Sequence, residues 1–252
     1  MQRAVLVTGA NRGLGLELIR QLSRAERPPR YLFAACRDPE GARGTDLKNL
    51  AKGFSNIKIV NMDLDDFDSI QTSAEEIQKL LKNDGLNLLI NNAAINIDGG
   101  LNDITPEMMT KTHTINVIGP MMVTKAFLPA LMKAAQLSDE PGFSSKKAAV
   151  INMSSIMGSM ETFSVHFYWK AFAYRISKAG LNMVTKCLTN ELTPHGILCA
   201  SVHPGWVKTD MGTEKAKLTK EESIQGLLRV FSNLSDKDNG SFIDWRGERV
   251  PW

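Results

Sequence analysis

The stretch Thr8-Gly9-Ala10-Asn11-Arg12-Gly13-Leu14-Gly15 decides the fold of this 252-residue chain. It follows the apolar run Ala4–Val7 and precedes the helical pattern Leu16–Leu22, so it joins a buried strand to a helix. Glycines permit positive φ angles and close backbone approach, and the first N–H groups of a helix attract anions. The spacing G-x-x-x-G-x-G matches neither G-x-G-x-x-G nor the G-K-[ST] ending of a P-loop. Glycines also form ordinary turns. The order of strand, glycine-rich turn and helix nevertheless predicts a phosphate-binding turn, as in a dinucleotide site.

Short apolar runs alternate with helical patterns outward from this turn. The runs are Ala4–Val7, Tyr31–Ala35, Ile57–Val60, Leu86–Ile90, Ala148–Met153 and Leu198–Val202. The helical stretches are about Leu14–Arg24, Asp66–Lys82, Pro106–Ala135, Tyr174–Glu191 and Lys220–Phe231. Continuous apolar strands separated by helices predict an α/β fold, a doubly wound Rossmann-like parallel sheet with helices on both faces. Such a sheet binds ligands beyond the carboxyl ends of its strands.

No linker divides the chain, so we expect one domain over residues 1–252 that both binds the cofactor and performs catalysis. The polar segments Gln136–Lys147 and Ser235–Gly240 are expected to be surface loops. The final stretch, Ser241–Trp252, has strand character.

The composition excludes several classes of protein. The chain has 43% hydrophobic and 23% charged residues, which is ordinary for a globular domain. A net charge of +3 gives no reason to expect nucleic acid or a membrane surface as a partner. The three cysteines are widely spaced and form no metal-binding pattern, so no metal is expected. Without a signal segment or an apolar run of ~20 residues, we predict a cytoplasmic protein.

Tyr174-Arg175-Ile176-Ser177-Lys178 is the first candidate for catalysis. Residues four apart share one helical face, so the phenol and the ammonium can share a site. A free phenol has a pKa of ~10, and a nearby cation lowers it toward the range needed for proton exchange. Such pairs also occur on exposed helices. Of the three tyrosines, Tyr174 alone is followed by a lysine at this spacing.

Other polar residues follow the remaining strands. Ser155 ends Asn152-Met153-Ser154-Ser155, and Asn91-Asn92-Ala93-Ala94 ends another apolar run, where small residues allow a flat ligand to approach. Asn116 is polar within a long apolar helix, and Pro204–Thr209 follows the last of the core runs. Each has an ordinary alternative: serines form turns at strand ends, and Asn116 could mark a surface position or a helix kink.

Taken together, these motifs resemble those of the short-chain dehydrogenase/reductase family over essentially the whole chain. The resemblance rests on Thr8–Gly15, Asn91–Ala94 with alanine in place of the usual final glycine, and Pro204–Thr209. It implies a catalytic tetrad of Asn116, Ser155, Tyr174 and Lys178. Within the family, the chain is similar to the C-factor and sniffer-type carbonyl reductases.

One departure concerns the choice of tyrosine. The family usually places its tyrosine nearer the serine, at the position of Tyr168, but Tyr168 has no lysine four residues later. We therefore assign Tyr174. The extra residues Glu161–Ala173 are rich in Phe, Trp and Tyr and are expected to form a lip over the substrate. The expected apolar borders of the substrate pocket are Ile95–Leu101, Ile156–Ala173 and Trp206–Leu218, with Met157, Met160, Phe163, Phe167 and Trp169.

The end of the second strand selects the cofactor. A carboxylate there binds the ribose 2′-hydroxyl of NAD, whereas an arginine accommodates the 2′-phosphate of NADP. The chain has Arg37 at this place, and Arg12 adds a second cation from the glycine turn, so we predict NADP(H). The expected cofactor-binding set is Gly9, Asn11, Arg12, Gly13, Leu14, Gly15, Arg37, Asp63, Leu64, Asn92, Ala93, Ala94, Tyr174, Lys178, Pro204, Gly205, Val207 and Thr209.

The resemblance implies reduction of a small hydrophobic aldehyde, ketone or quinone by hydride transfer from NADPH, with tyrosine as the proton donor. In that mechanism Ser155 orients the carbonyl, Lys178 lowers the tyrosine pKa and holds the ribose, and Asn116 positions a relay water. Two alternatives remain open: an alcohol or hydroxysteroid dehydrogenase acting oxidatively, and a non-catalytic NADP(H)-binding sensor. The resemblance also implies association through the helices that contain Asn116 and Tyr174, so a homodimer is expected, with a tetramer as the alternative.

Overall fold

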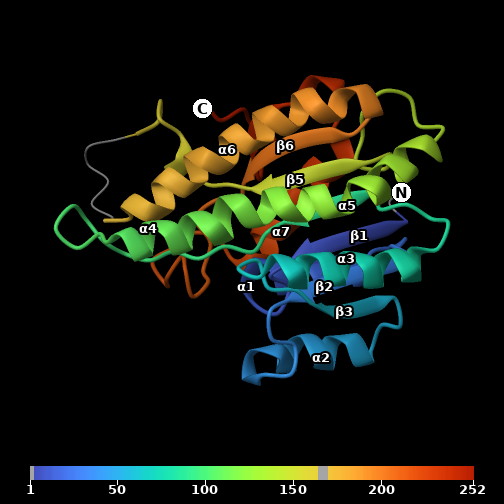
Figure 1. Ribbon diagram of the computed structural model, residues 1–252, viewed down its shortest axis with the longest axis horizontal. Coiled ribbons are helices and arrows are strands. Elements are labelled where there is room, and N and C mark those ends of the chain that lie inside the picture. Colours follow the sequence, from blue (N-terminus) through green and yellow to red (C-terminus); the bar gives the residue numbers. More distant parts are fainter. Residues whose placement is uncertain (1–2, 164–169) are drawn as a thin grey trace.

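A seven-stranded parallel sheet forms the centre of the molecule (Figure 1). The computed structural model describes residues 3–163 and 170–252. The strands lie in the order β3-β2-β1-β4-β5-β6-β7. Their bounds are β1 Ala4–Thr8, β2 Tyr31–Cys36, β3 Ile57–Asn61, β4 Leu88–Asn91, β5 Ala149–Met153, β6 Leu198–His203 and β7 Ser241–Asp244. The order reverses between β1 and β4, which is where this class of sheet binds its ligand.

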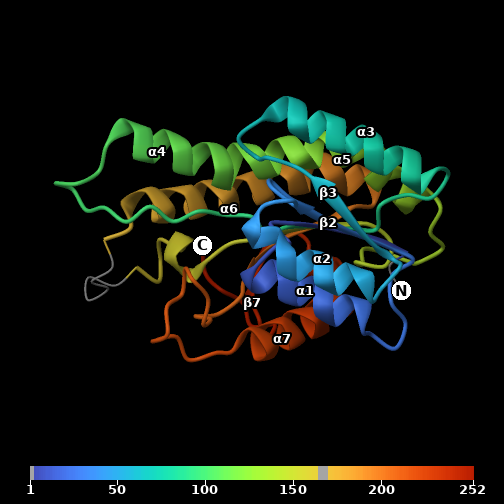
Figure 2. The same ribbon diagram turned by 90° about the horizontal axis from the view of Figure 1, so that it is seen from below.

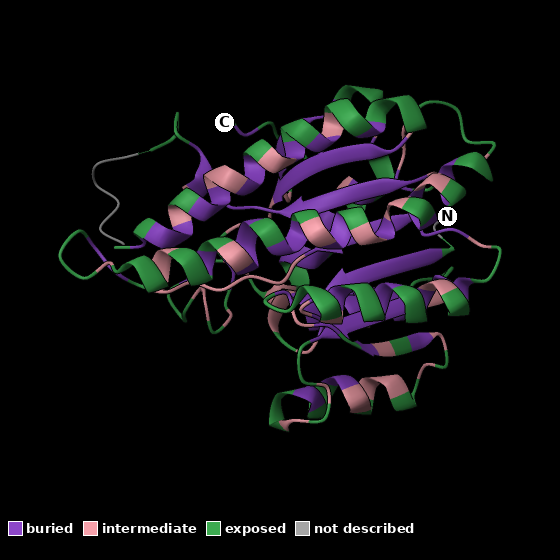
Figure 3. Ribbon diagram, viewed as in Figure 1, coloured by how far each residue is buried: buried purple, intermediate pink, exposed green. Residues whose placement is uncertain are grey.

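Helices cover both faces of the sheet, as Figure 2 shows. On one face lie α3 (Phe67–Leu81), α4 (Pro106–His113), α5 (Gly119–Gln136) and α6 (Phe172–Leu192). On the other face lie α1 (Gly13–Ser23), α2 (Thr45–Lys52) and α7 (Lys220–Asn233). Two apolar clusters result, one on each face of the sheet, and Figure 3 shows the strands between them largely buried, with exposed positions on the edge strand β3. The predicted doubly wound fold is therefore confirmed.

The differences from the predicted elements are local. Helix α2 and the short 3-10 turn η1 (Ala42–Gly44) were not expected, because this stretch is short and polar. The single helix expected over Pro106–Ala135 is instead α4, a π-helical turn η2 (Thr114–Ile118), and α5. Further 3-10 turns are η3 (Ile156–Gly158), η4 (Thr193–His195) and η5 (Asp236–Asp238).

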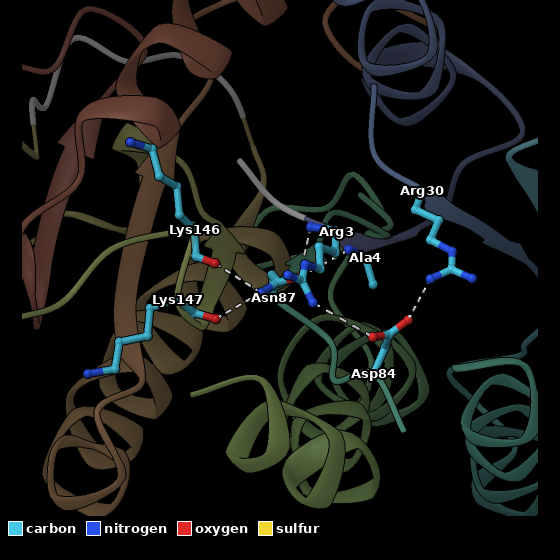
Figure 4. A network of polar contacts seen from close by, with 7 residues as sticks. All are labelled: Arg3, Ala4, Arg30, Asp84, Asn87, Lys146 and Lys147. Atoms are coloured by element: carbon cyan, nitrogen blue, oxygen red, sulfur yellow. Dashed lines mark hydrogen bonds and ion pairs between the residues drawn. The ribbon is translucent and has the colours of Figure 1, made fainter. Parts of the chain in front are cut away.

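A polar network fixes the amino ends of the strands, away from the predicted site (Figure 4). The side-chain oxygen of Asn87 accepts hydrogen bonds from the backbone N–H groups of Arg3 and Ala4, at 2.9 and 3.1 Å. Its amide nitrogen donates to the carbonyls of Lys146 and Lys147, at 2.9 and 3.0 Å. One buried asparagine thus ties the starts of β1, β4 and β5 together, which holds the register of the central strands.

One stretch of the described chain, Pro106–Gln136, is long and apolar enough to cross a membrane. No stretch of this kind was expected from the sequence. Slightly more than half of its most apolar window, 56%, is buried inside the molecule. Val123, Phe127 and Leu131 belong to the core cluster beneath α5, so packing against the sheet accounts for this apolar composition.

Candidate active site

The glycine turn connects β1 to α1 at the point where the strand order reverses. Gly9 has φ +66° and Gly13 has φ +56°, conformations that favour glycine. A Cβ on Gly9 would lie 2.8 Å from Ala93 Cα, so glycine also allows the β1 and β4 loops to touch. A Cβ on Gly13 would meet a single atom, Thr209 Cγ2 at 3.8 Å, so this side of the turn faces open space.

The N-terminus of α1 points its free N–H groups toward that open space. Its N-cap residue, Arg12, is extended and its side chain makes no capping hydrogen bond, so Arg12 leaves the first N–H groups of the helix unsatisfied. Asn92 fixes the neighbouring loop, since its side chain donates to the Thr8 carbonyl at 2.8 Å and its backbone N–H donates to Thr8 Oγ1 at 3.0 Å. This geometry suits the pyrophosphate of a dinucleotide.

A cleft of about 690 Å³ runs along the carboxyl ends of the strands. Every residue of the predicted cofactor-binding set lines it, and so do Ser155, Tyr174 and Lys178 of the predicted tetrad. The structure thus brings together residues from seven separate segments of the chain. Their individual roles stay predictions.

Tyr174 and Ser155 face each other in this cleft. Ser155 follows β5, and Tyr174 lies in the first turn of α6 with 9% of its surface exposed. The two side chains are hydrogen-bonded. Burial raises the pKa of Tyr174 to about 12, and the Ser155 hydrogen bond opposes that rise. The phenol is therefore protonated at neutral pH.

Lys178 lies one helical turn after Tyr174 and is almost completely buried. Its Nζ donates to the carbonyl of Met153 at 2.7 Å and lies 5.6 Å from the centre of the Tyr174 ring. Burial lowers the pKa of Lys178 to about 7. The expected lowering of the tyrosine pKa is not seen in this geometry, because desolvation of the phenol outweighs the influence of a partly neutral amine.

Asn116 is the tetrad member that does not line the cleft. It is fully buried in η2, where its oxygen accepts from Ile95 N at 2.9 Å and its amide donates to Ile95 O at 2.8 Å and Ser177 Oγ at 3.0 Å. These bonds tie the π-helical turn to the loop after β4 and to α6. π-Helical turns are frequent at functional sites.

The other candidate tyrosine, Tyr168, lies outside the described residues. Of the expected apolar borders, Ile95, Ile156, Met157, Trp206 and Met211 line the cleft. Met160 and Phe163 are 75% and 59% exposed and do not line it, and Phe167 and Trp169 also lie outside the described residues.

Three arginines border the cleft near the end of β2 and the glycine turn. Arg37 follows β2, and Arg43 lies in η1; within residues 3–163 and 170–252, neither forms an ion pair. Arg12 instead pairs with Asp210, with Nη1 and Oδ2 2.7 Å apart. Unpaired guanidinium groups fit a phosphate at this end of the cleft.

Sequence reasoning missed Arg43 as a residue of the cleft, and it did not single out Asp210 within the expected border Trp206–Leu218. Arg43 and Asp210 reach it through loops whose path no periodicity predicts, although Asp210 directly follows the motif Pro204–Thr209. His203 ends β6, and burial lowers its pKa to about 4 while Asp244 opposes the change. Among the described residues, no group of three or more histidine, cysteine or acidic side chains could hold a metal ion.

Comparisons with known proteins agree with this geometry. Residues 3–220 match the family model described as short chain dehydrogenase. The solved structure of an NADPH-bound carbonyl reductase from chicken fatty liver is 45% identical, covering 100% of this chain and 99% of that one, with a TM-score of 0.95. Carbonyl reductase Sniffer of D. melanogaster is 39% identical over 100% of both chains, also with a TM-score of 0.95. The C-signal protein of Myxococcus xanthus is 38% identical over 66% of this chain and 93% of its own length.

Proposed function

This chain belongs to the short-chain dehydrogenase family, and from that premise we propose that it reduces a hydrophobic aldehyde, ketone or quinone with NADPH. The observation that supports the proposal best is the pairing of Tyr174 with Ser155 in the wall of the cleft, one helical turn from Lys178. A second support is the likeness to two carbonyl reductases, one of them bound to NADPH.

NADPH would supply the hydride to the carbonyl carbon of the substrate. Ser155 would donate a hydrogen bond to the carbonyl oxygen and hold it beside Tyr174. As negative charge develops on that oxygen, the Tyr174 hydroxyl would transfer its proton, which completes the alcohol. A phenol with a pKa of about 12 is fully protonated at neutral pH, so it is ready to act in this direction.

Lys178 would stabilise the phenolate that remains after the transfer, since a cation favours the charged form of a neighbouring acid. It would also donate to the ribose hydroxyls of the cofactor. We propose that Asn116 supports this relay by holding the Ile95 loop and Ser177, next to Lys178, in place.

The cleft offers a complete set of groups for NADP(H). The glycine turn and the first N–H groups of α1 would bind the pyrophosphate, and Arg37, with Arg12 and Arg43 nearby, would bind the 2′-phosphate. Asp63 and Leu64 follow β3 and would contact the adenine. Ile95, Ile156 and Met157 give the other end of the cleft the apolar character that suits a hydrophobic carbonyl.

We further propose that one domain, residues 1–252, performs both cofactor binding and catalysis, and that the enzyme is a cytoplasmic homodimer. Cys36, Cys187 and Cys199 are free thiols, as a reducing compartment would leave them. Exposed apolar side chains on α5 and α6 support the dimer.

The test is the oxidation of NADPH by the Tyr174→Phe variant with a panel of aldehydes, ketones and quinones. We expect kcat to fall by a factor of about 10² to 10⁴, the usual contribution of a proton donor, while NADPH still binds. Tyr31→Phe is the matched control, because Tyr31 begins β2 at the opposite end of the strands and stacks on Phe33.

If the wild type binds NADPH but reduces none of the carbonyls, the chain is a sensor rather than a reductase. If it oxidises alcohols with NADP⁺ much faster than it reduces carbonyls, the oxidative alternative replaces the proposal.

A further inference from the structure

The Arg12–Asp210 ion pair joins two of the segments that line the cleft. Arg12 belongs to the glycine turn, and Asp210 belongs to the loop that follows β6. Their Nη1 and Oδ2 atoms are 2.7 Å apart, and the two side chains are 44% and 75% exposed. Both residues line the cleft. The Asp210 carboxylate is therefore already paired with Arg12, one of the cations that are expected to bind the cofactor.

The loop holds Asp210 in this place independently of Arg12. Its ends are paired, since Lys208 N donates to Leu218 O at 2.9 Å and Leu218 N donates to Trp206 O at 3.1 Å. Its tip is a turn in which Gly212 N donates to Thr209 Oγ1 at 3.0 Å. Asp210 lies inside this turn, so its carboxylate stays near Arg12 even when another anion competes for the guanidinium.

The three arginines at this end of the cleft are thus in different states. Arg37 and Arg43 form no ion pair with any described residue, whereas the charge of Arg12 is already balanced. A phosphate that binds here gains two free guanidinium groups, but it gains the third only by displacing a carboxylate.

We infer that Asp210 is a specificity-determining residue, which competes with the 2′-phosphate of NADP(H) for Arg12 and so limits the preference for NADPH over NADH. The inference rests on the proposed placement of the 2′-phosphate near Arg12 and Arg37. An exposed ion pair changes an equilibrium constant by up to about five-fold. Asp210 can therefore change the dissociation constant of NADPH by about this factor.

The test compares the wild type with the Asp210→Asn variant. The dissociation constants of NADPH and NADH are measured for both proteins by cofactor fluorescence. Asparagine keeps the shape of the side chain and removes its charge. We expect NADPH to bind about two- to five-fold more tightly to the variant, and NADH to change by clearly less. Glu214→Gln, an exposed residue of the same loop outside the cleft, is the matched control and should alter neither constant.

The same substitution in an Arg12→Gln protein tests whether Asp210 acts through Arg12. In an Arg12→Gln protein, Asp210→Asn should leave the NADPH constant unchanged, because the guanidinium for which it competes is gone. An effect that persists there, an equal gain for NADH, or no gain for NADPH would each overturn the inference. A wild type that binds NADPH but reduces no carbonyl would remove the proposed reaction and leave this inference standing.

Discussion

At the scale of single residues, we expect the charge beside β2 to determine which cofactor fits. Arg37 follows the strand directly and borders the cleft without an ion pair to any described residue. We predict that Arg37→Asp raises the KM for NADPH by about 10- to 100-fold, since a hydrogen bond to a charged group contributes about 1.5–3 kcal/mol. The KM for NADH should stay within about two-fold, because NADH lacks the 2′-phosphate and an acidic residue here suits its 2′-hydroxyl.

Steady-state kinetics with both cofactors and one carbonyl substrate check this prediction. Arg27→Asp makes the same charge change at an exposed position outside the cleft and should alter neither constant. An Arg37→Asp enzyme with the cofactor preference of the wild type would show that the 2′-phosphate binds elsewhere.

The spacing of Tyr174 and Lys178 predicted that they share a site, and the structure places both in the cleft. It did not predict their pKa values, which are about 12 and about 7. Helical spacing predicts that two side chains of one helix lie close together. The pKa shifts of Tyr174 and Lys178 arise instead from their burial beneath the ends of the strands. Burial depends on how distant segments pack, so a motif alone cannot supply it.

At the scale of elements, the π-helical turn η2 is the feature that connects fold and site. Asn116 holds both backbone groups of Ile95 and also bonds Ser177 on α6. We predict that Asn116→Ala lowers the free energy of unfolding by about 2–4 kcal/mol, because each buried polar group left without a partner costs about 1–3 kcal/mol. Urea denaturation measures the change.

Asn61→Ala is the control for this prediction, because Asn61 is exposed at the end of β3. This substitution should lower the free energy of unfolding by no more than about 0.5 kcal/mol. If Asn116→Ala were as stable as the wild type and yet had a much lower kcat, Asn116 would act in proton transfer and not by holding the loop.

Element boundaries show which structural features the sequence can predict. The core strands were predicted to within two residues at each end, because buried parallel strands are continuous apolar runs. Helix α2 was missed, since eight mostly polar residues with one buried leucine, Leu47, carry a weak periodic signal. The π-helical turn was missed because an inserted residue in a long apolar helix leaves its composition unchanged.

At the scale of the whole molecule, the sheet assembles the site from segments far apart in the chain. Parallel strands end at one edge, so the loops after β1, β2, β4, β5 and β6 all reach the same cleft. This rule predicted which motifs would meet. It could not predict the Arg12–Asp210 contact, which joins residues 198 positions apart through the detailed path of one loop.

The outer surface of α5 and α6 is the region through which we expect two copies of the protein to associate. Ile118 at the end of η2 and Met121 in the first turn of α5 are 37% and 38% exposed, and Phe172, Ile176 and Met183 are 44%, 49% and 62% exposed on α6. The α6 residues recur at helical spacing, so they form one apolar stripe. Figure 1 shows α5 and α6 side by side on one face of the molecule. Water-exposed apolar stripes of this kind mark interaction surfaces.

We predict that the protein elutes as a homodimer in size-exclusion chromatography with light scattering, and that Met183→Asp converts it to a monomer. A charge in the middle of an apolar interface loses its hydration without gaining a partner, which weakens association by several kcal/mol. Leu80→Asp makes the same change at an exposed leucine of α3, away from the stripe, and should leave the dimer intact. If the wild type is a monomer at micromolar concentration, or if Met183→Asp stays dimeric, α6 does not form the subunit interface.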